Sequence, residues 1–180
     1  GEQHGHINAV GFDTYLKLLE EAVRELKGEE APLEVRTSMN LALDLRIPPD
    51  YVAEERQRLR AYRRIGEAHD QASAREVLDE LSDRYGPPPQ AVSDLVEFSL
   101  LKSLAGRVGI ELVERRQGYL NVKFHPESRV DPGALMRLVQ NTAGAQFTPA
   151  GVLRVPLDGQ AAPAAVLAVL RGCIEEIATG

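Results

Sequence analysis

The side chains that could do chemistry in this chain are few and scattered. Its 180 residues include four histidines and one cysteine. Glu2, His4 and His6 alternate near the start, so an extended backbone would place both imidazoles on one side. Only three candidate ligands lie close together there, whereas a structural zinc site normally has four. We therefore expect no metal site.

The other reactive residue types also favour structural roles. Cys173 lies in an apolar run, where a cysteine normally packs as a small hydrophobic residue. His69 and His125 are far apart in the sequence, and we expect each to be structural or solvated. The chain has no G-x-x-x-x-G-K-[ST] loop, no G-x-G-x-x-G after a strand and no G-x-S-x-G elbow. Because these motifs are missing, we predict no catalytic residue and no cofactor for this chain.

Four carboxylates form the one cluster that stands out, on a predicted helix before Gly86. They are Glu76, Asp79, Glu80 and Asp83, here called the acidic stripe. Their spacing places them opposite the apolar side of that helix, which consists of Val77, Leu78, Leu81 and Tyr85. The stripe is either a solvated face, partly paired with arginines of residues 56–64, or a docking surface for arginines of another domain.

The distribution of charge along the chain argues against nucleic-acid binding and against an enzyme that uses the acidic stripe. Residues 67–98 carry two basic and eight acidic side chains, whereas residues 51–66 carry five arginines and two glutamates. There is no broad cationic track for nucleic acid, and we expect residues 56–64 to serve packing and ion pairing more than DNA contact. An enzyme using the acidic stripe would need carboxylates with raised pKa values in a pocket, which a solvent-facing helix cannot supply.

Two regions must position these residues. Apolar residues at helical spacing predict an amphipathic helix over residues 12–26, ended by Gly28, and a polar linker follows it. We place a domain boundary there, giving residues 1–34 and 35–180. No signal peptide and no apolar run of 18 residues are present, so we expect a cytoplasmic location.

The second region begins with alternating apolar residues over 41–47, which predict a half-buried strand. Pro48-Pro49-Asp50 is expected to end the strand and start a helix. Ser73 and Glu76 have the spacing of a capping box for the acidic helix. The prolines at 87–89 open another helix, which closes near Gly106.

Hairpins and helices then alternate to the end of the chain. Gln117-Gly118 and Pro149-Ala150-Gly151 are predicted hairpin turns. Asp131-Pro132 begins a helix between them, and a helix over about 161–178 follows. The order predicts an α+β fold, with a mostly antiparallel sheet of about five strands covered by helices and preceded by a long connecting helix.

Several segments together resemble the C-terminal region of the bacterial transcription-repair coupling factors (Mfd). The segment GEQHGHINAVGFDTYLKLLEEAV is similar to the junction that ends the motor module of that family. The segments LALDLRIPPDYV, RLRAYRRI and ELSDRYGPPP are similar to its C-terminal domain. In this chain the connection after Ile47 is short.

The resemblance implies that the full-length protein is an ATP-dependent DNA translocase of helicase superfamily 2, using ATP and Mg. It would displace stalled RNA polymerase and recruit UvrA through a UvrB-like N-terminal module. The C-terminal domain would be a non-catalytic, autoinhibitory clamp that packs on this module and masks the UvrA-binding surface.

The resemblance also assigns roles to individual residues. It places Glu80 and Asp83 at the clamp carboxylates, with Glu76 and Asp79 as weaker extensions, and Gln3 at the hook glutamine of the motor. The alternative is an independent adaptor whose acidic helix recruits a basic partner in trans.

Overall fold

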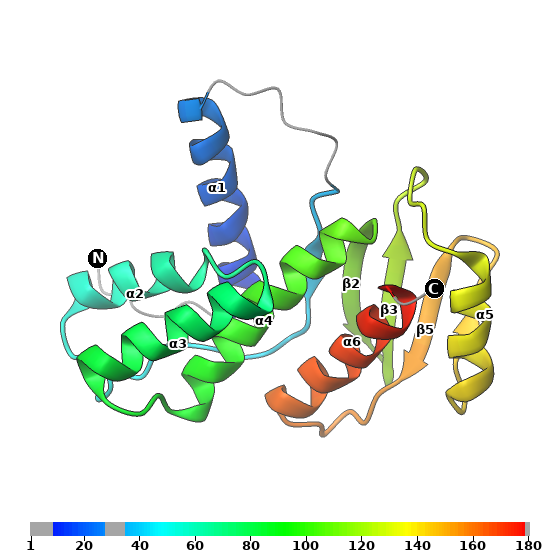
Figure 1. Ribbon diagram of the computed structural model, residues 1–180. Helices are drawn as coiled ribbons and strands as arrows, with labels where there is room; N and C mark the ends of the chain where they lie inside the picture. Colours follow the sequence, from blue (N-terminus) through cyan, green and yellow to red (C-terminus); the bar gives the residue numbers. More distant parts are fainter. Residues whose placement is uncertain (1–8, 28–34, 179–180) are drawn as a thin grey trace.

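Six helices and five strands follow one another along the part of the chain that the structure describes, residues 9–27 and 35–178 of a computed structural model (Figure 1). The helices are α1 (Ala9–Lys27), α2 (Glu55–Ile65), α3 (Gln71–Tyr85), α4 (Gln90–Arg107), α5 (Pro132–Asn141) and α6 (Pro163–Ala178). The strands are β1 (Ser38–Asn40), β2 (Ile110–Arg116), β3 (Tyr119–Phe124), β4 (Gln146–Phe147) and β5 (Val152–Pro156).

The strands form one sheet in the order β1-β2-β3-β5-β4. β1 pairs parallel to β2, and every other pair is antiparallel. The β2–β3 turn has φ 47° at Gln117 and 81° at Gly118. Positive φ at both central residues suits a hairpin turn that follows the right-handed twist of the strands. This turn and the second hairpin, around residues 149–151, are confirmed.

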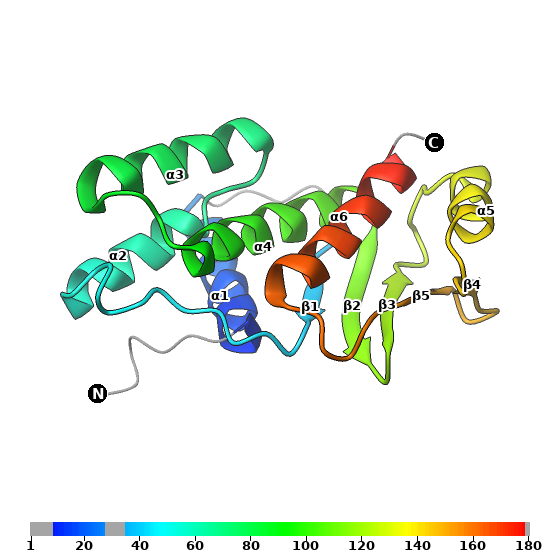
Figure 2. The ribbon, with the colours of Figure 1, turned by 90° about the horizontal axis from the view of Figure 1, so that it is seen from below.

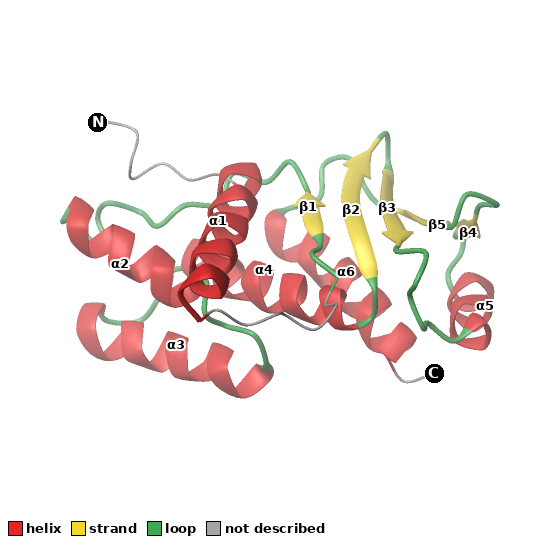
Figure 3. Ribbon diagram, turned by 90° about the horizontal axis from the view of Figure 1, so that it is seen from above, coloured by secondary structure: helices red, strands yellow, loops and turns green. Residues whose placement is uncertain are grey.

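Helices cover one face of this sheet. α4 and α6 lie on the same side of the strands (Figures 2 and 3). The strands bury alternate residues beneath them, namely Val113, Leu120, Val122, Leu153 and Val155. Tyr119 lies on the opposite side of the sheet, where the Arg154 guanidinium is 4.1 Å from its ring centre. The predicted α+β fold with a mostly antiparallel five-stranded sheet is therefore confirmed.

A helical lobe of α2 and α3 packs against α4 on the side away from the sheet (Figure 1). Arg171 of α6 fixes α6 to α4 through Glu97, with Nε–Oε1 and Nη2–Oε2 distances of 2.5 and 2.8 Å. Two parallel bonds from a guanidinium to one carboxylate are geometrically specific. The lobe is thereby connected to the sheet through α4, and the position of α3 follows from that of α4.

Helix α1 packs into the same core as the residues that follow it. Phe12 is fully buried, and its ring lies 5.7 Å from that of Phe98. Asp13 is buried beside it, with Oδ1 3.3 Å from Lys102 Nζ and Oδ2 3.3 Å from the Met39 amide nitrogen. α1 and residues 35–178 therefore share a core, while the assignment of residues 1–34 to a motor module stays a prediction.

The strand predicted over residues 41–47 is wrong, although its alternation is real. The strand ends at Asn40, and Ala42 has a φ of 53°, which turns the backbone out of the ladder. Leu41, Leu43, Leu45 and Ile47 are nevertheless buried. The amide of Ile47 donates to the Tyr62 hydroxyl at 2.8 Å, so α2 replaces a neighbouring strand as the hydrogen-bond partner. An extended segment that runs along a core buries every second side chain, as a strand does, so both have the same apolar period of two.

The start of α2 also differs from the prediction. Pro48 begins a turn, in which the amides of Tyr51 and Val52 donate to its carbonyl, and the helix begins only at Glu55. Later boundaries follow the sequence more closely. Asp131 caps α5 by accepting from the Gly133 amide at 3.0 Å, with Pro132 in the first turn. The last helix ends at Ala178, as predicted.

Candidate interaction surface on helix α3

Helix α3 begins with a capping box that lies earlier than the sequence suggested. Asp70 is the N-cap and accepts from the Ser73 amide at 2.7 Å, while Ser73 Oγ accepts from the Asp70 amide at 3.1 Å. The predicted box between Ser73 and Glu76 is wrong, because Ser73 is the third helical residue and not the cap. The hydrogen bonds from Ser73 lower the pKa of Asp70. Glu76 is thereby left free of any capping role.

One side of α3 anchors the helix in the core. Ala74, Val77 and Leu81 are buried, and Leu78 and Tyr85 pack against the core with part of their surface exposed. This is the apolar side predicted from the helical spacing. Because these side chains hold α3 against α2 and α4, its polar side has a fixed orientation.

The acidic stripe occupies the exposed side of the helix. Its four members, Glu76, Asp79, Glu80 and Asp83, are all exposed. Within the described residues, Glu76, Asp79 and Asp83 have no ion-pair partner. Arg75 and Arg84 are also exposed on α3 and reduce its net charge. The arrangement is a row of exposed carboxylates on an anchored helix, suited to bind cations on another surface.

The C-terminal end of α3 is held in place from the loop before α2. The Tyr51 hydroxyl lies 3.1 Å from the Leu81 carbonyl oxygen and 2.8 Å from that of Gly86. The Tyr51 and Tyr85 rings meet edge to face, with centroids 5.7 Å apart. Burial raises the pKa of Tyr51, with a further contribution from Tyr85. This contact holds the turn of the helix that carries Asp83.

Glu80 differs from the rest of the stripe because an arginine of α2 already binds it. Arg64 Nε lies 2.7 Å from Glu80 Oε2, and Arg64 Nη1 lies 2.9 Å from Glu67 Oε2. The hydrogen bond that Arg64 donates to Glu80 is the main cause of the raised pKa of Arg64. The predicted pairing of the stripe with the arginines of residues 56–64 thus holds for one carboxylate, and spacing alone did not identify which arginine.

The other arginines of α2 have separate surroundings. Arg58 Nη1 donates to the carbonyls of Val52 and Ala53 at 2.9 and 2.7 Å, which stabilises the loop before the helix. Arg56, Arg60 and Arg63 are exposed, with no ion pair among the described residues. One of the five therefore serves loop packing and one serves ion pairing.

Both isolated histidines that the sequence singled out contribute to local structure. His69 Nδ1 lies 3.0 Å from the Glu67 carbonyl oxygen in the turn between α2 and α3. His125 Nδ1 accepts from the Glu127 amide at 3.1 Å in the loop after β3. These contacts agree with the structural role predicted for each of them.

Cys173 is a buried residue of α6, as the sequence indicated. Burial raises its pKa to about 11, with a further contribution from the nearby Glu176. The thiol is therefore protonated near neutral pH, which disfavours nucleophilic chemistry.

We expect iodoacetamide to alkylate Cys173 at least about tenfold more slowly at pH 8.5 in the native chain than in the urea-unfolded chain, because the thiolate is the reactive form. The raised pKa also predicts a stability contribution that is present below pH 9 and is lost as pH rises toward 11. Unfolding of the parent and of Cys173→Ala, followed between pH 8 and 10, should show this difference. Equal alkylation rates in the two states would contradict the prediction.

Several of the residues proposed from the sequence lie outside the described residues. Gln3 and the Glu2, His4 and His6 set belong to this group. Within residues 9–27 and 35–178, no group of three or more His, Cys, Asp or Glu side chains could hold a metal ion. No helix in those two segments is long and apolar enough to cross a membrane.

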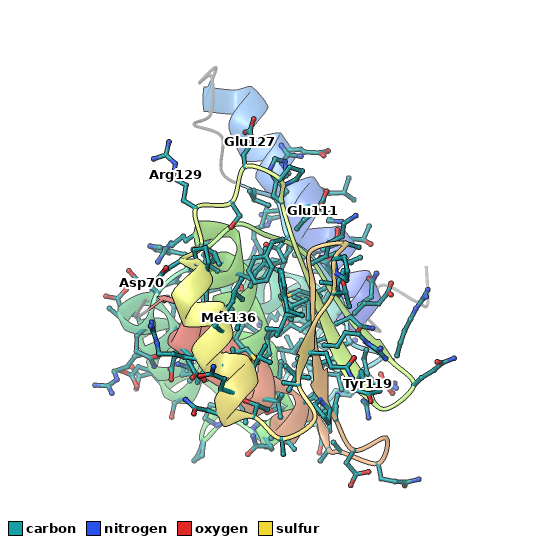
Figure 4. All side chains as sticks on the ribbon, turned by 90° about the vertical axis from the view of Figure 1, so that its right-hand side faces the viewer. Asp70, Glu111, Tyr119, Glu127, Arg129 and Met136 are labelled. Carbon is teal, nitrogen blue, oxygen red and sulfur yellow. The ribbon has the colours of Figure 1, made fainter. Side chains whose placement is uncertain are left out.

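A separate open groove lies beside the C-terminal end of α4. It has a volume of about 920 Å³ and is bounded by the end of α4, the start of β2 and the loop between β3 and α5. Its charged lining mixes signs, as with Glu111, Glu127 and Arg129. Glu127 and Arg129 project outward from the loop (Figure 4). Such a wide, mixed surface has no preference for one ligand charge.

Taken together, the fold is that of an α+β domain in which a helical lobe presents an acidic helix beside a half-covered sheet. Residues 41–135, from the segment before α2 to the first turn of α5, match the TRCF domain family. This match covers more than half of the chain, including all of α3. The chain belongs to the TRCF domain family.

Named relatives agree with this assignment. The chain is 34% identical over 143 residues to the transcription-repair-coupling factor of Myxococcus xanthus. This alignment covers 79% of the chain and 12% of the relative. It is 33% identical over 144 residues to the Escherichia coli protein of the same name, and this alignment covers 77% of the chain and 12% of the relative. The chain thus spans about an eighth of the length of these relatives.

A solved structure has the same fold. The crystal structure of a C-terminal domain of transcription-repair coupling factor superposes with a TM-score of 0.68 at 20% identity. The match covers 82% of this chain and 98% of that one. The chain therefore shares the fold of that C-terminal domain.

Proposed function

We propose that this domain is the autoinhibitory clamp of a transcription-coupled DNA repair translocase. In the resting protein it docks on a UvrB-like N-terminal module through the acidic stripe of α3 and masks the surface that binds UvrA. The observation that carries the proposal is the stripe itself, four exposed carboxylates on a helix anchored by Val77 and Leu81. Membership of the TRCF family supplies the context for the stripe.

The physical basis is charge complementarity with arginines on the docked module. Carboxylates that are already fixed on a helix lose little freedom when a partner arrives, so binding is less costly than for a mobile loop. Glu80 and Asp83 are the principal residues, and Glu76 and Asp79 extend the surface toward the start of α3. A coupling of about 1–3 kcal/mol suffices to change exposure of a masked site 5- to 150-fold.

The activities of the whole protein belong to the proposal as well. The relatives are named transcription-repair-coupling factors, and the chain covers only a small part of their length. We place ATP and Mg binding, DNA translocation and contact with RNA polymerase in a full-length cytoplasmic protein, outside residues 35–180. Residues 1–34 would be the end of the motor module, with Gln3 as its hook.

Replacing Glu80 and Asp83 together by alanine tests the clamp. Both side chains are exposed, so we expect the domain to keep its unfolding temperature within a few degrees. In the full-length protein the double variant should bind UvrA about five- to fiftyfold more tightly, measured by biolayer interferometry, because the masking contact is weakened.

Arg75→Ala together with Arg84→Ala is the matched control, since both are exposed residues of α3 with the opposite charge. This control should not raise UvrA binding. A folded Glu80→Ala, Asp83→Ala protein that binds UvrA no better than the parent would rule out the acidic clamp.

The second candidate is an independent adaptor that recruits a basic partner in trans. The exposed stripe supports it equally, since a carboxylate row binds arginines whichever chain supplies them. The two functions differ when this chain is mixed with the UvrB-like module. Association that is abolished by the Glu80→Ala, Asp83→Ala pair supports the clamp, whereas no association supports the adaptor.

A further inference from the structure

Glu80 of the acidic stripe is the only stripe member, within the described part of the chain, that is already paired with an arginine. The guanidinium comes from Arg64 on α2, which runs beside α3 (Figures 1 and 2). From this geometry we infer that Arg64 is an internal competitor for the docking partner: it occupies Glu80 in the undocked domain and keeps the clamp weak enough to open. The inference rests on the proposed function of the stripe.

The pair has the geometry that a docking arginine would form. Arg64 Nε donates to Glu80 Oε2 at 2.7 Å, which is a charge-assisted hydrogen bond of ordinary length. An incoming guanidinium seeking the same carboxylate must share it or displace Arg64. Displacement removes one ion pair for each one formed, so the gain at Glu80 is smaller than at a free carboxylate.

A second carboxylate makes the displacement feasible. Arg64 Nη1 also donates to Glu67 Oε2 at 2.9 Å, three residues further along the chain. When Glu80 is taken by a partner, Arg64 therefore keeps a carboxylate and is not left uncompensated. Side-chain exposures of 31% for Arg64 and 45% for Glu80 leave the pair accessible to such an exchange.

The contrast within the stripe supports this reading. Asp83, one helical turn beyond Asp79, is exposed and has no partner among residues 9–27 and 35–178. Docking at Asp83 is thus unopposed, while docking at Glu80 is opposed by Arg64. The two principal residues of the clamp therefore contribute differently, and the domain itself limits the strength of its own docking.

Neutralising Arg64 tests the inference in the full-length protein. Arg64→Gln removes the competitor and a positive charge next to the stripe, and both changes favour an arginine-bearing partner. UvrA binding should fall about two- to fivefold relative to the parent, because the surface is masked more of the time. Arg63→Gln is the control: it removes the same charge from an exposed arginine of α2 that has no ion pair among the described residues.

A double-mutant cycle separates competition from general charge. In a Glu80→Gln background, Arg64→Gln should change UvrA binding no more than Arg63→Gln does, because there is no carboxylate left to compete for. If Arg64→Gln matches Arg63→Gln in the parent background, or raises UvrA binding, the competitor role is wrong. If the Glu80→Ala, Asp83→Ala protein also fails to raise UvrA binding, the proposed function itself has failed.

Discussion

Replacing Lys102 by methionine should destabilise the chain by about 3 kcal/mol. Lys102 and Asp13 are 5% and 3% exposed, and their charged atoms lie 3.3 Å apart between α4 and α1. Breaking a buried pair leaves the other charge uncompensated, which typically costs 3–5 kcal/mol. Lys17 Nζ lies 3.6 Å from the same carboxylate and offsets part of the loss, so we expect the lower end of this range.

Urea denaturation followed by circular dichroism measures this loss, and hydrogen exchange of the α1 amides locates it. Asp13→Leu combined with Lys102→Met should recover much of the stability, since well-packed apolar residues often replace a buried ion pair without loss. Lys123→Met is the control, because Lys123 is exposed and lies 3.9 Å from Glu111. A loss of less than about 1 kcal/mol in Lys102→Met would show that the pair does not hold α1 in the core.

Replacing Phe98 by alanine should cost about 4 kcal/mol of unfolding free energy. Phe98 is fully buried in α4, and its ring faces that of Phe12. Truncating a buried phenylalanine removes its transfer free energy and leaves a cavity, with a typical loss of 3–5 kcal/mol. The ring contact with Phe12 is lost as well, which loosens α1.

The matched control is Phe147→Ala, which makes the same chemical change in β4, where the side chain is 44% exposed. We expect a loss near 1 kcal/mol there, measured by the same urea denaturation. Similar losses of unfolding free energy for the two variants would contradict the conclusion that Phe98 belongs to the core and Phe147 does not.

Together these two variants concern α1, whose role the sequence described only in part. Helical spacing predicted that α1 is amphipathic, but not which surface receives its apolar side. Phe12 packs against Phe98, which is 86 positions later in the sequence. Likewise, nothing in the local pattern pairs Asp13 with Lys102, because such a pair depends on how two helices cross.

Local turn and cap preferences correctly predicted several of the other element boundaries. Positive-φ turn residues at Gln117-Gly118, the Asp131-Pro132 helix start and Gly86 after α3 each produced the predicted element boundary, since turn and cap preferences act over a few residues. The errors arose where two local signals are equivalent. Residues 41–47 alternate in burial like a strand, but Ala42 leaves the ladder, and a period of two cannot distinguish the two cases.

The candidate site shows the same division. Helical spacing alone placed Glu76, Asp79, Glu80 and Asp83 on one exposed side of α3, because residues three and four apart share a helix face. Only the tertiary structure brought Arg64 of α2 to Glu80 and the Tyr51 hydroxyl to the end of α3. The sequence by itself therefore determined where the carboxylates point, and the packing of α2 against α3 decided which of them is already engaged, since that contact joins residues 16 positions apart.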